Sequence, residues 1–228
     1  MDFLLDTADL SAIKECYGIF KLKGVTTNPS IIANTVKDNP YKALREIWEY
    51  LKTVQGELHI QTLSNDKGGI IREAETLVSL YGLGISVKIP ATREGLKAIK
   101  VLSAEGIQVT ATAILSYSQG VLAALNGASS LAVYCNRMQD LGVDYEGVIR
   151  DVHICCPDCR ILGASFRTFD QVRKAFLSGA GACTLTPQLL LSQLDQRPVK
   201  DAVSGFEAAW EEKYGEWSAA ALFSVSAT

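Results

Sequence analysis

Eight short runs of β-branched and other apolar residues recur along the chain, and this recurrence constrains the fold more than any other feature. The runs are FLLDT (3–7), GVTTN (24–28), ELHIQT (57–62), ISVKIP (85–90), QVTATA (108–113), SLAVYC (130–135), RILGAS (160–165) and ACTLTP (182–187). They begin 21 to 33 residues apart, so each interval has room for one helix and two loops. This strand count favours a barrel over the competing doubly wound open sheet. The sequence therefore predicts an α/β protein with a single (β/α)₈ TIM barrel.

Helical patterns fill most of the intervals. Residues 93–106 follow Thr92, a candidate N-cap, and place leucine and isoleucine at helical spacing. Further helices are predicted at 41–51, 66–81, 116–125, 169–177 and, after the last run, 201–214. No linker or low-complexity segment divides the chain, so we expect one barrel domain over residues 1–228, with residues 200–228 as an additional C-terminal helix and tail.

Composition argues against several classes of partner. The formal net charge of −3 disfavours nucleic acid and anionic membrane surfaces as partners. No apolar run approaches the roughly 20 residues that span a bilayer, and MDFLLDTADLSAIKE lacks the basic leader of a signal peptide. The six cysteines are therefore expected to be free thiols, and the CxxC of Cys156 and Cys159 to have a structural or incidental role. We expect a cytoplasmic protein.

Lys88 is the least expected residue of these runs, because an ammonium group is rarely buried without a partner. Side chains alternate along a strand, so Ile85 and Ile89 share one face of ISVKIP and Lys88 lies on the other. The apolar face has to meet the helices. Lys88 is therefore predicted to point into the barrel.

Polar residues also stand at the C-terminal ends of the other strands, where barrel enzymes build their active sites. Those expected to converge with Lys88 are Asp6, Thr26 or Thr27 with Asn28, Gln61, Thr112, Tyr134 and Ser165. Each of them, taken singly, is equally consistent with an ordinary strand-end polar residue. Lys88 and Asp6 together inside an apolar barrel favour a functional site, because an unpaired buried charge is costly.

A desolvated lysine has a lowered pKa and can attack a carbonyl group to form a Schiff base. Asp6 and Tyr134 are suited to moving protons, and Gln61 and Thr112 to holding a water molecule. These residues and Lys88 are the predicted catalytic set. The only two histidines of the chain offer no ligand cluster, so no metal site is predicted.

Two motifs resemble those of the transaldolase family: GVTTNPS (24–30) resembles its signature, and VKIPAT (87–92) the segment with its Schiff-base lysine. LDT (5–7), YCNR (134–137) and ASFR (164–167) fall in the family's order, and the match runs from about residue 2 to about residue 215. The resemblance implies a (β/α)₈ barrel and a lysine-imine mechanism without metal or other cofactor. It also implies a ring-shaped homo-oligomer, a pentamer or decamer, with residues 200–228 packed between neighbours.

Within this family, aldolase-type members carry Gln on strand three and Tyr on strand six, where transaldolases typically have Glu and Phe. Gln61 and Tyr134 thus imply a fructose-6-phosphate aldolase, which cleaves that ketose, or a similar one with a terminal anion, to dihydroxyacetone and glyceraldehyde 3-phosphate. The alternative is a transaldolase that moves a dihydroxyacetone unit between sugar phosphates or sulfosugar analogues. A pyridoxal-phosphate barrel and a non-catalytic ligand-binding barrel are more remote alternatives.

The expected partner is a small sugar phosphate. Arg137, Ser165 and Arg167 match the family's phosphate-binding positions, and Thr26 and Asn28 complete the predicted substrate-binding set. Arginine suits multidentate contacts to an anion, and serine adds one further hydrogen bond. A sulfonate would suit the same donors.

Overall fold

The computed structural model describes residues 1–215 and 218 of the 228-residue chain. The chain divides into two compact units, Met1–Leu189 and Leu190–Thr228, and each is described by itself. Among the described residues, no helix is both long and apolar enough to cross a membrane.

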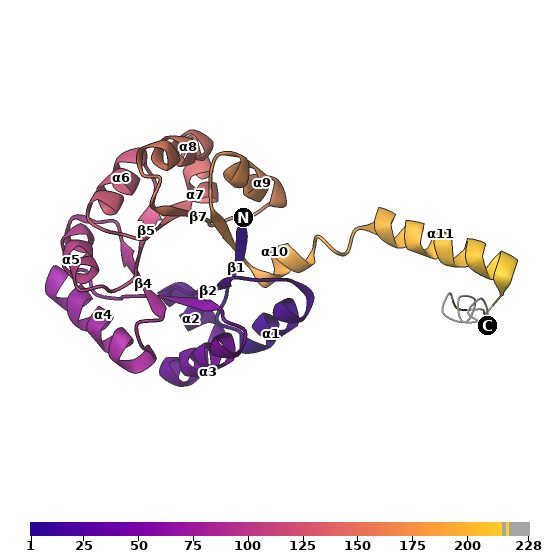
Figure 1. Cartoon of the computed structure of the whole chain (residues 1–228), viewed down its shortest axis with the longest axis horizontal. Helices are drawn as coiled ribbons and strands as arrows, with labels where there is room; N and C mark the ends of the chain where they lie inside the picture. The colour runs from indigo at the N-terminus through magenta and orange to yellow at the C-terminus, as the bar shows by residue number, and fades with distance from the viewer. Residues whose placement is uncertain (216–217, 219–228) are drawn as a thin grey trace, which may run out of the picture. The chain divides into compact units, whose positions relative to one another are not determined.

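The first unit is a closed barrel of eight parallel strands (Figure 1). The strands are β1 (Asp2–Asp6), β2 (Gly24–Thr26), β3 (Glu57–Gln61), β4 (Ile85–Pro90), β5 (Val109–Ile114), β6 (Ser130–Tyr134), β7 (Arg160–Ala164) and β8 (Ala182–Leu185). Each strand pairs with the next, and β8 pairs with β1 through Leu4 and Thr184, among others. The predicted (β/α)₈ barrel is confirmed, and the open sheet is excluded.

Helices surround this ring of strands (Figure 1). They are α1 (Leu10–Ile19), α2 (Pro29–Thr35), α3 (Pro40–Thr53), α4 (Lys67–Tyr81), α5 (Arg93–Ala104), α6 (Tyr117–Leu125), α7 (Cys135–Asp140), α8 (Tyr145–Cys155) and α9 (Phe169–Leu177). Helix α10 (Pro187–Leu191) follows β8 and ends in the second unit. The sequence patterns had singled out no helix where α1, α2, α7 and α8 lie. Helix α1 buries only Ile13 and Cys16, so its apolar stripe is short.

Helix starts explain why two strands, β2 and β8, end two residues earlier than predicted. Strand β2 stops at Thr26 because Asn28 caps α2, its side chain accepting a hydrogen bond from the backbone of Ile31 at 2.9 Å. Strand β8 stops at Leu185, two residues before Pro187 begins α10. These early ends place polar loop residues directly above the strands.

The barrel interior is apolar on one side and polar on the other. Leu4, Ala132, Leu162 and Ala182, from β1 and β6 to β8, form a buried cluster against which Tyr134 packs. On the opposite side, Thr110 Oγ1 lies 2.9 Å from His59 Nδ1 and 2.7 Å from Ser86 Oγ. Lys88 belongs to this polar side, because it follows Ser86 by two residues on β4 and pairs with Thr110 of β5.

Strand β5 contains a bulge that the sequence patterns did not reveal. Ala111 pairs with Leu131, but the next pair joins Ile114 to Val133, so β5 carries one extra residue. Ala113 absorbs it with φ of +57°, a left-handed conformation that is costly for a residue with a Cβ.

The second unit contains α11 (Arg197–Tyr214), which confirms the helix predicted at 201–214 and extends it toward the N-terminus. Val199, Val203 and Phe206 follow helical spacing and are exposed, Phe206 to 72%. The expectation of a C-terminal tail at 200–228 falls in part on residues 216–217 and 219–228, which lie outside the described residues.

Candidate active site

A cavity of about 330 Å³ opens at the C-terminal ends of the strands. Its lining residues are Asp6, Asn28, Pro29, Ser30, Gln61, Lys88, Ala132, Tyr134, Arg137, Leu162, Ala164, Ser165 and Thr184. This set includes most of the site residues expected from the sequence. A second cavity of about 190 Å³ shares Asp6, Arg137, Ser165 and Thr184 with the first and adds Arg167.

Lys88 is buried at the floor of the site, with 4% of its surface exposed. Its Nζ donates a hydrogen bond to the backbone oxygen of Thr27 at 2.7 Å. Burial lowers the pKa of the Lys88 amine, and the negative charge of Asp6 offsets part of this effect. The amine is therefore easier to deprotonate than a surface lysine, which is what a nucleophile requires.

Asp6 is fixed by a threonine pair behind it. Thr26 Oγ1 donates to Asp6 Oδ1 at 2.7 Å and lies 2.7 Å from Thr184 Oγ1. A hydroxyl has one hydrogen, so Thr184 is the donor to Thr26. Thr26 is fully buried and does not line the cavity, whereas Thr184 does.

Tyr134 also lines the cavity, and a hydroxyl group of β5 orients its side chain. Its hydroxyl is 3.2 Å from Oγ1 of Thr112, which is buried next to the bulge and does not line the cavity. The Arg137 guanidinium lies 5.5 Å from the centre of the Tyr134 ring. Gln61 Oε1 is buried without a hydrogen-bond partner in the described part of the chain, so it can accept a hydrogen bond from a substrate or water.

The arginines lie on two short segments at one end of the site. Arg137 belongs to α7, and Arg167 belongs to the loop between β7 and α9. The Arg167 side chain is 73% exposed, and its Nη2 lies 3.9 Å from Asp140 Oδ2. Ser165 has a left-handed φ of +61°, and its backbone oxygen accepts a hydrogen bond from the Asn136 backbone.

Several lining residues had not been singled out from the sequence. Thr184 stands near the end of β8, so the strand-end rule that selected the others could have found it. Ala132, Leu162 and Ala164 form an apolar wall, for which a sequence offers no distinctive signal.

Histidines, cysteines and carboxylates elsewhere in the described chain form no cluster suited to a metal ion. No group of three or more His, Cys, Asp or Glu suitable for a metal occurs among residues 1–215 and 218. All six cysteines are free thiols. Cys156 and Cys159 lie between α8 and β7, at the opposite end of the barrel from the cavity.

Comparison with solved structures supports the fold. One similar structure, described as "Native KDPGal structure", is 12% identical with a TM-score of 0.56, covering 82% of each chain. Another, described as "Structure of a cube-shaped, highly porous protein cage designed by fusing symmetric oligomeric domains", is 12% identical with a TM-score of 0.57, covering 92% of this chain and 80% of that one. At such identities the likeness shows a shared fold.

The family model "Transaldolase/Fructose-6-phosphate aldolase" matches residues 3–222, so the chain belongs to this family. Its enzymes are metal-independent Schiff-base aldolases and transaldolases acting on sugar phosphates, and membership implies one of these two activities. The family expected from GVTTNPS and VKIPAT is thereby confirmed.

Proposed function

We propose that the protein is a class I fructose-6-phosphate aldolase that reversibly cleaves this ketose to dihydroxyacetone and glyceraldehyde 3-phosphate. One observation carries the choice within the family: the Tyr134 hydroxyl, held by Thr112 at 3.2 Å, shares the cavity with Lys88 and the uncharged Gln61. In the related transaldolases the two positions are typically Phe and Glu.

Imine formation begins at Lys88. The neutral Nζ attacks the C2 carbonyl of the ketose, and the oxygen becomes a hydroxyl as a proton passes from nitrogen to oxygen through Tyr134 or a water beside it. Loss of that hydroxyl as water takes up one further proton, which comes from solvent through Tyr134 or the water beside it, and leaves a protonated imine. Because Lys88 lies on the cavity floor with its pKa lowered by burial, this step needs no metal.

Carbon–carbon cleavage then uses the imine as an electron sink. The C3–C4 bond breaks, its electron pair moves through C3 and C2 to the imine nitrogen, and an enamine forms. The C4 hydroxyl loses its proton to the Asp6 carboxylate as the aldehyde of glyceraldehyde 3-phosphate appears. Thr26 supports this role by holding Asp6 Oδ1 at 2.7 Å.

Release of the second product distinguishes an aldolase from a transaldolase. The proton that Asp6 took from the C4 hydroxyl passes to C3 of the enamine, which restores the imine and the Asp6 carboxylate, and addition of water at C2 then frees dihydroxyacetone and the Lys88 amine. We assign the positioning of this water to Tyr134 and Gln61, with Thr112 orienting Tyr134. In a transaldolase the enamine instead adds to an acceptor aldehyde.

The terminal phosphate is assigned to the arginine end of the cavities. Arg137, Ser165 and Arg167 are the proposed ligands, and Asn28, which lines the larger cavity, is assigned to the sugar hydroxyls. Thr26 acts here through Asp6, since it is fully buried. A homo-oligomer, a pentamer or decamer, and a cytoplasmic location complete the proposal, both resting on the family.

The test is to incubate the purified protein with fructose 6-phosphate alone and to measure glyceraldehyde 3-phosphate with a coupled dehydrogenase. We expect steady product formation without any acceptor. Product that appears only after erythrose 4-phosphate is added would make the protein a transaldolase. Activity on a sulfonate analogue but not on the phosphate would reassign the terminal anion.

A further inference from the structure

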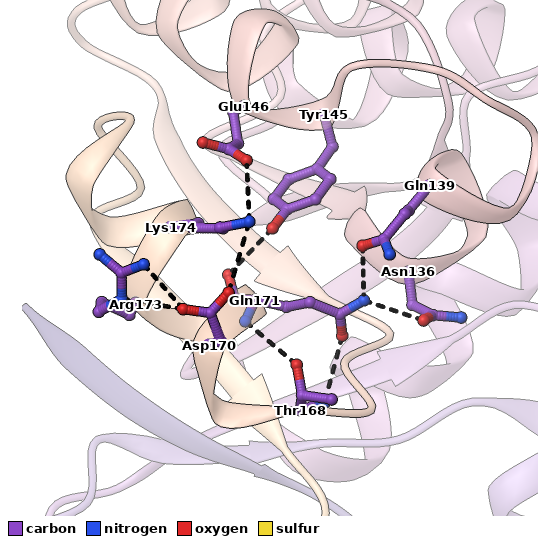
Figure 2. A network of polar contacts seen from close by, with 9 residues as sticks. All are labelled: Asn136, Gln139, Tyr145, Glu146, Thr168, Asp170, Gln171, Arg173 and Lys174. Atoms are coloured by element: carbon purple, nitrogen blue, oxygen red, sulfur yellow. Dashed lines mark hydrogen bonds and ion pairs between the residues drawn. The ribbon is translucent and has the colours of Figure 1, made fainter.

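Gln171 is a buried side chain of α9 that the mechanism above does not use, with 6% of its surface exposed. Figure 2 shows its amide between α7 and the loop that precedes α9, the two segments that carry Arg137 and Arg167. An amide buried in this way needs partners for two donors and two acceptor positions, so its contacts are informative.

Every described polar contact of the amide joins these two segments. Toward α7, Nε2 donates to Asn136 Oδ1 at 3.0 Å and to Gln139 Oε1 at 2.9 Å. Toward the loop, Oε1 accepts from the backbone N–H of Arg167 at 2.8 Å and of Thr168 at 3.2 Å. One planar group therefore fixes the distance between the segments (Figure 2).

The partners of Gln171 extend this connection to the cavity. The Asn136 backbone N–H donates to the carbonyl of Ser165 at 3.0 Å, and Asn136 Nδ2 donates to Asp140 Oδ2 at 2.9 Å. That same carboxylate oxygen lies 3.9 Å from Arg167 Nη2. A shift of the Gln171 amide would therefore displace Ser165, Arg137 and Arg167 relative to one another.

We propose that Gln171 is a positioning residue that sets the spacing of Arg137, Ser165 and Arg167 and thereby the affinity of the site for the terminal anion of the substrate. This inference rests on the proposed function only in taking these three residues as the anion ligands. Gln171 touches no reacting atom, so its loss affects the binding of an anion and leaves imine chemistry at Lys88 intact.

A glutamate at position 171 tests the contacts to α7 separately from the contacts to the loop before α9. Gln171→Glu retains an acceptor for the two loop N–H groups but places a carboxylate oxygen against two amide oxygens of α7. Gln171→Met removes the hydrogen bonds to both segments while keeping a side chain of similar volume. The matched control is Arg173→Gln, which removes an exposed ion pair with Asp170 on the same helix.

Two measurements test the proposal in the full-length protein. The first is the dissociation constant of inorganic phosphate; the second is kcat/KM for glyceraldehyde 3-phosphate and for uncharged glyceraldehyde, each with dihydroxyacetone in the synthetic direction. In Gln171→Glu and Gln171→Met we expect about tenfold weaker phosphate binding and a similar fall in kcat/KM for the phosphorylated aldehyde. With glyceraldehyde, kcat/KM should change less than twofold, and Arg173→Gln should behave as the wild type.

Equal losses with both aldehydes, or unchanged phosphate affinity, would overturn the proposal, as would a wild-type protein that binds no phosphate. If the Gln171 variants fail to fold, Gln139→Met is used instead, because it removes one acceptor of the Gln171 amide at an exposed position. A two- to threefold loss of phosphate affinity in this variant would support the proposal, and an unchanged affinity would overturn it. Phosphate binding that depends on Gln171 in a protein without aldolase activity would overturn the proposed function and support this inference.

Discussion

Burial of the Lys88 amine determines its reactivity, because burial changes the pKa of the same group that has to attack the carbonyl. Burial disfavours the ammonium form and lowers the pKa, whereas the Asp6 carboxylate favours that form and raises it. Below the lowered pKa the amine is protonated and cannot attack a carbonyl. Activity should therefore rise with pH through a value below the usual lysine range of about 10.4.

Asp6→Asn tests both roles of the carboxylate. Without the proton acceptor, kcat should fall by about 10²- to 10⁴-fold while KM changes far less. Because the Asp6 charge no longer raises the pKa of Lys88, the acid limb of the pH–rate profile should move to lower pH. A pH series of kcat/KM for both proteins checks this, and an unchanged rate or a limb displaced to higher pH would remove Asp6 from its assigned role.

The direction of a side chain could be predicted from the sequence where it depends only on neighbouring residues in the chain. The two-residue period of ISVKIP was enough to predict that Lys88 points inward, since strand alternation depends only on neighbours in the chain. Gln171 could not be found in this way. Its partners Asn136 and Gln139 are 35 and 32 residues away in sequence, so their meeting depends on how α7 and α9 pack.

At the scale of elements, the bulge in β5 is the feature closest to the proposed chemistry. It places a left-handed residue, Ala113, directly after Thr112, whose hydroxyl orients Tyr134. Strain of this kind is often found beside functional sites. The sequence run QVTATA predicted the strand but not the bulge, because alanine gives none of the usual signals of a positive φ.

Ala113→Gly should relieve this strain. Glycine adopts φ of +57° without a Cβ penalty, and after its larger entropic cost we expect the free energy of unfolding to rise by about 0.5 to 1 kcal/mol. Urea unfolding measures the change. The control is Ala111→Gly, a buried residue with no positive φ in the same strand, which should destabilise the protein. A decrease of the same size in both variants would show that the bulge stores no strain.

At the scale of the whole molecule, α11 presents apolar residues that a stable soluble helix ordinarily covers. Val199, Val203 and Phe206 are exposed in the described chain and recur at helical spacing. Family resemblance implies that neighbouring copies cover such a helix in a ring. The barrel was predictable from the order of its strands, but what covers α11 is not encoded in any local pattern of this chain.

The double substitution Val203→Glu and Phe206→Glu tests that assembly. We expect the wild-type protein to have the mass of a pentamer or decamer by light scattering and the variant to dissociate, because two charges would have to be desolvated at the interface. Ala208→Glu, an exposed position on another face of α11, serves as the control and should retain the assembly. A monomeric wild type, or a variant of undiminished mass, would contradict the expectation.

Reductive trapping shows directly whether Lys88 forms the imine. The protein is incubated with dihydroxyacetone, reduced with borohydride, digested and analysed by peptide mass spectrometry, with Lys88→Met treated in parallel. We expect one reduced adduct, located on Lys88, in the wild-type protein and none in the variant. No adduct in the wild type, or an adduct on another lysine that persists in Lys88→Met, would contradict it.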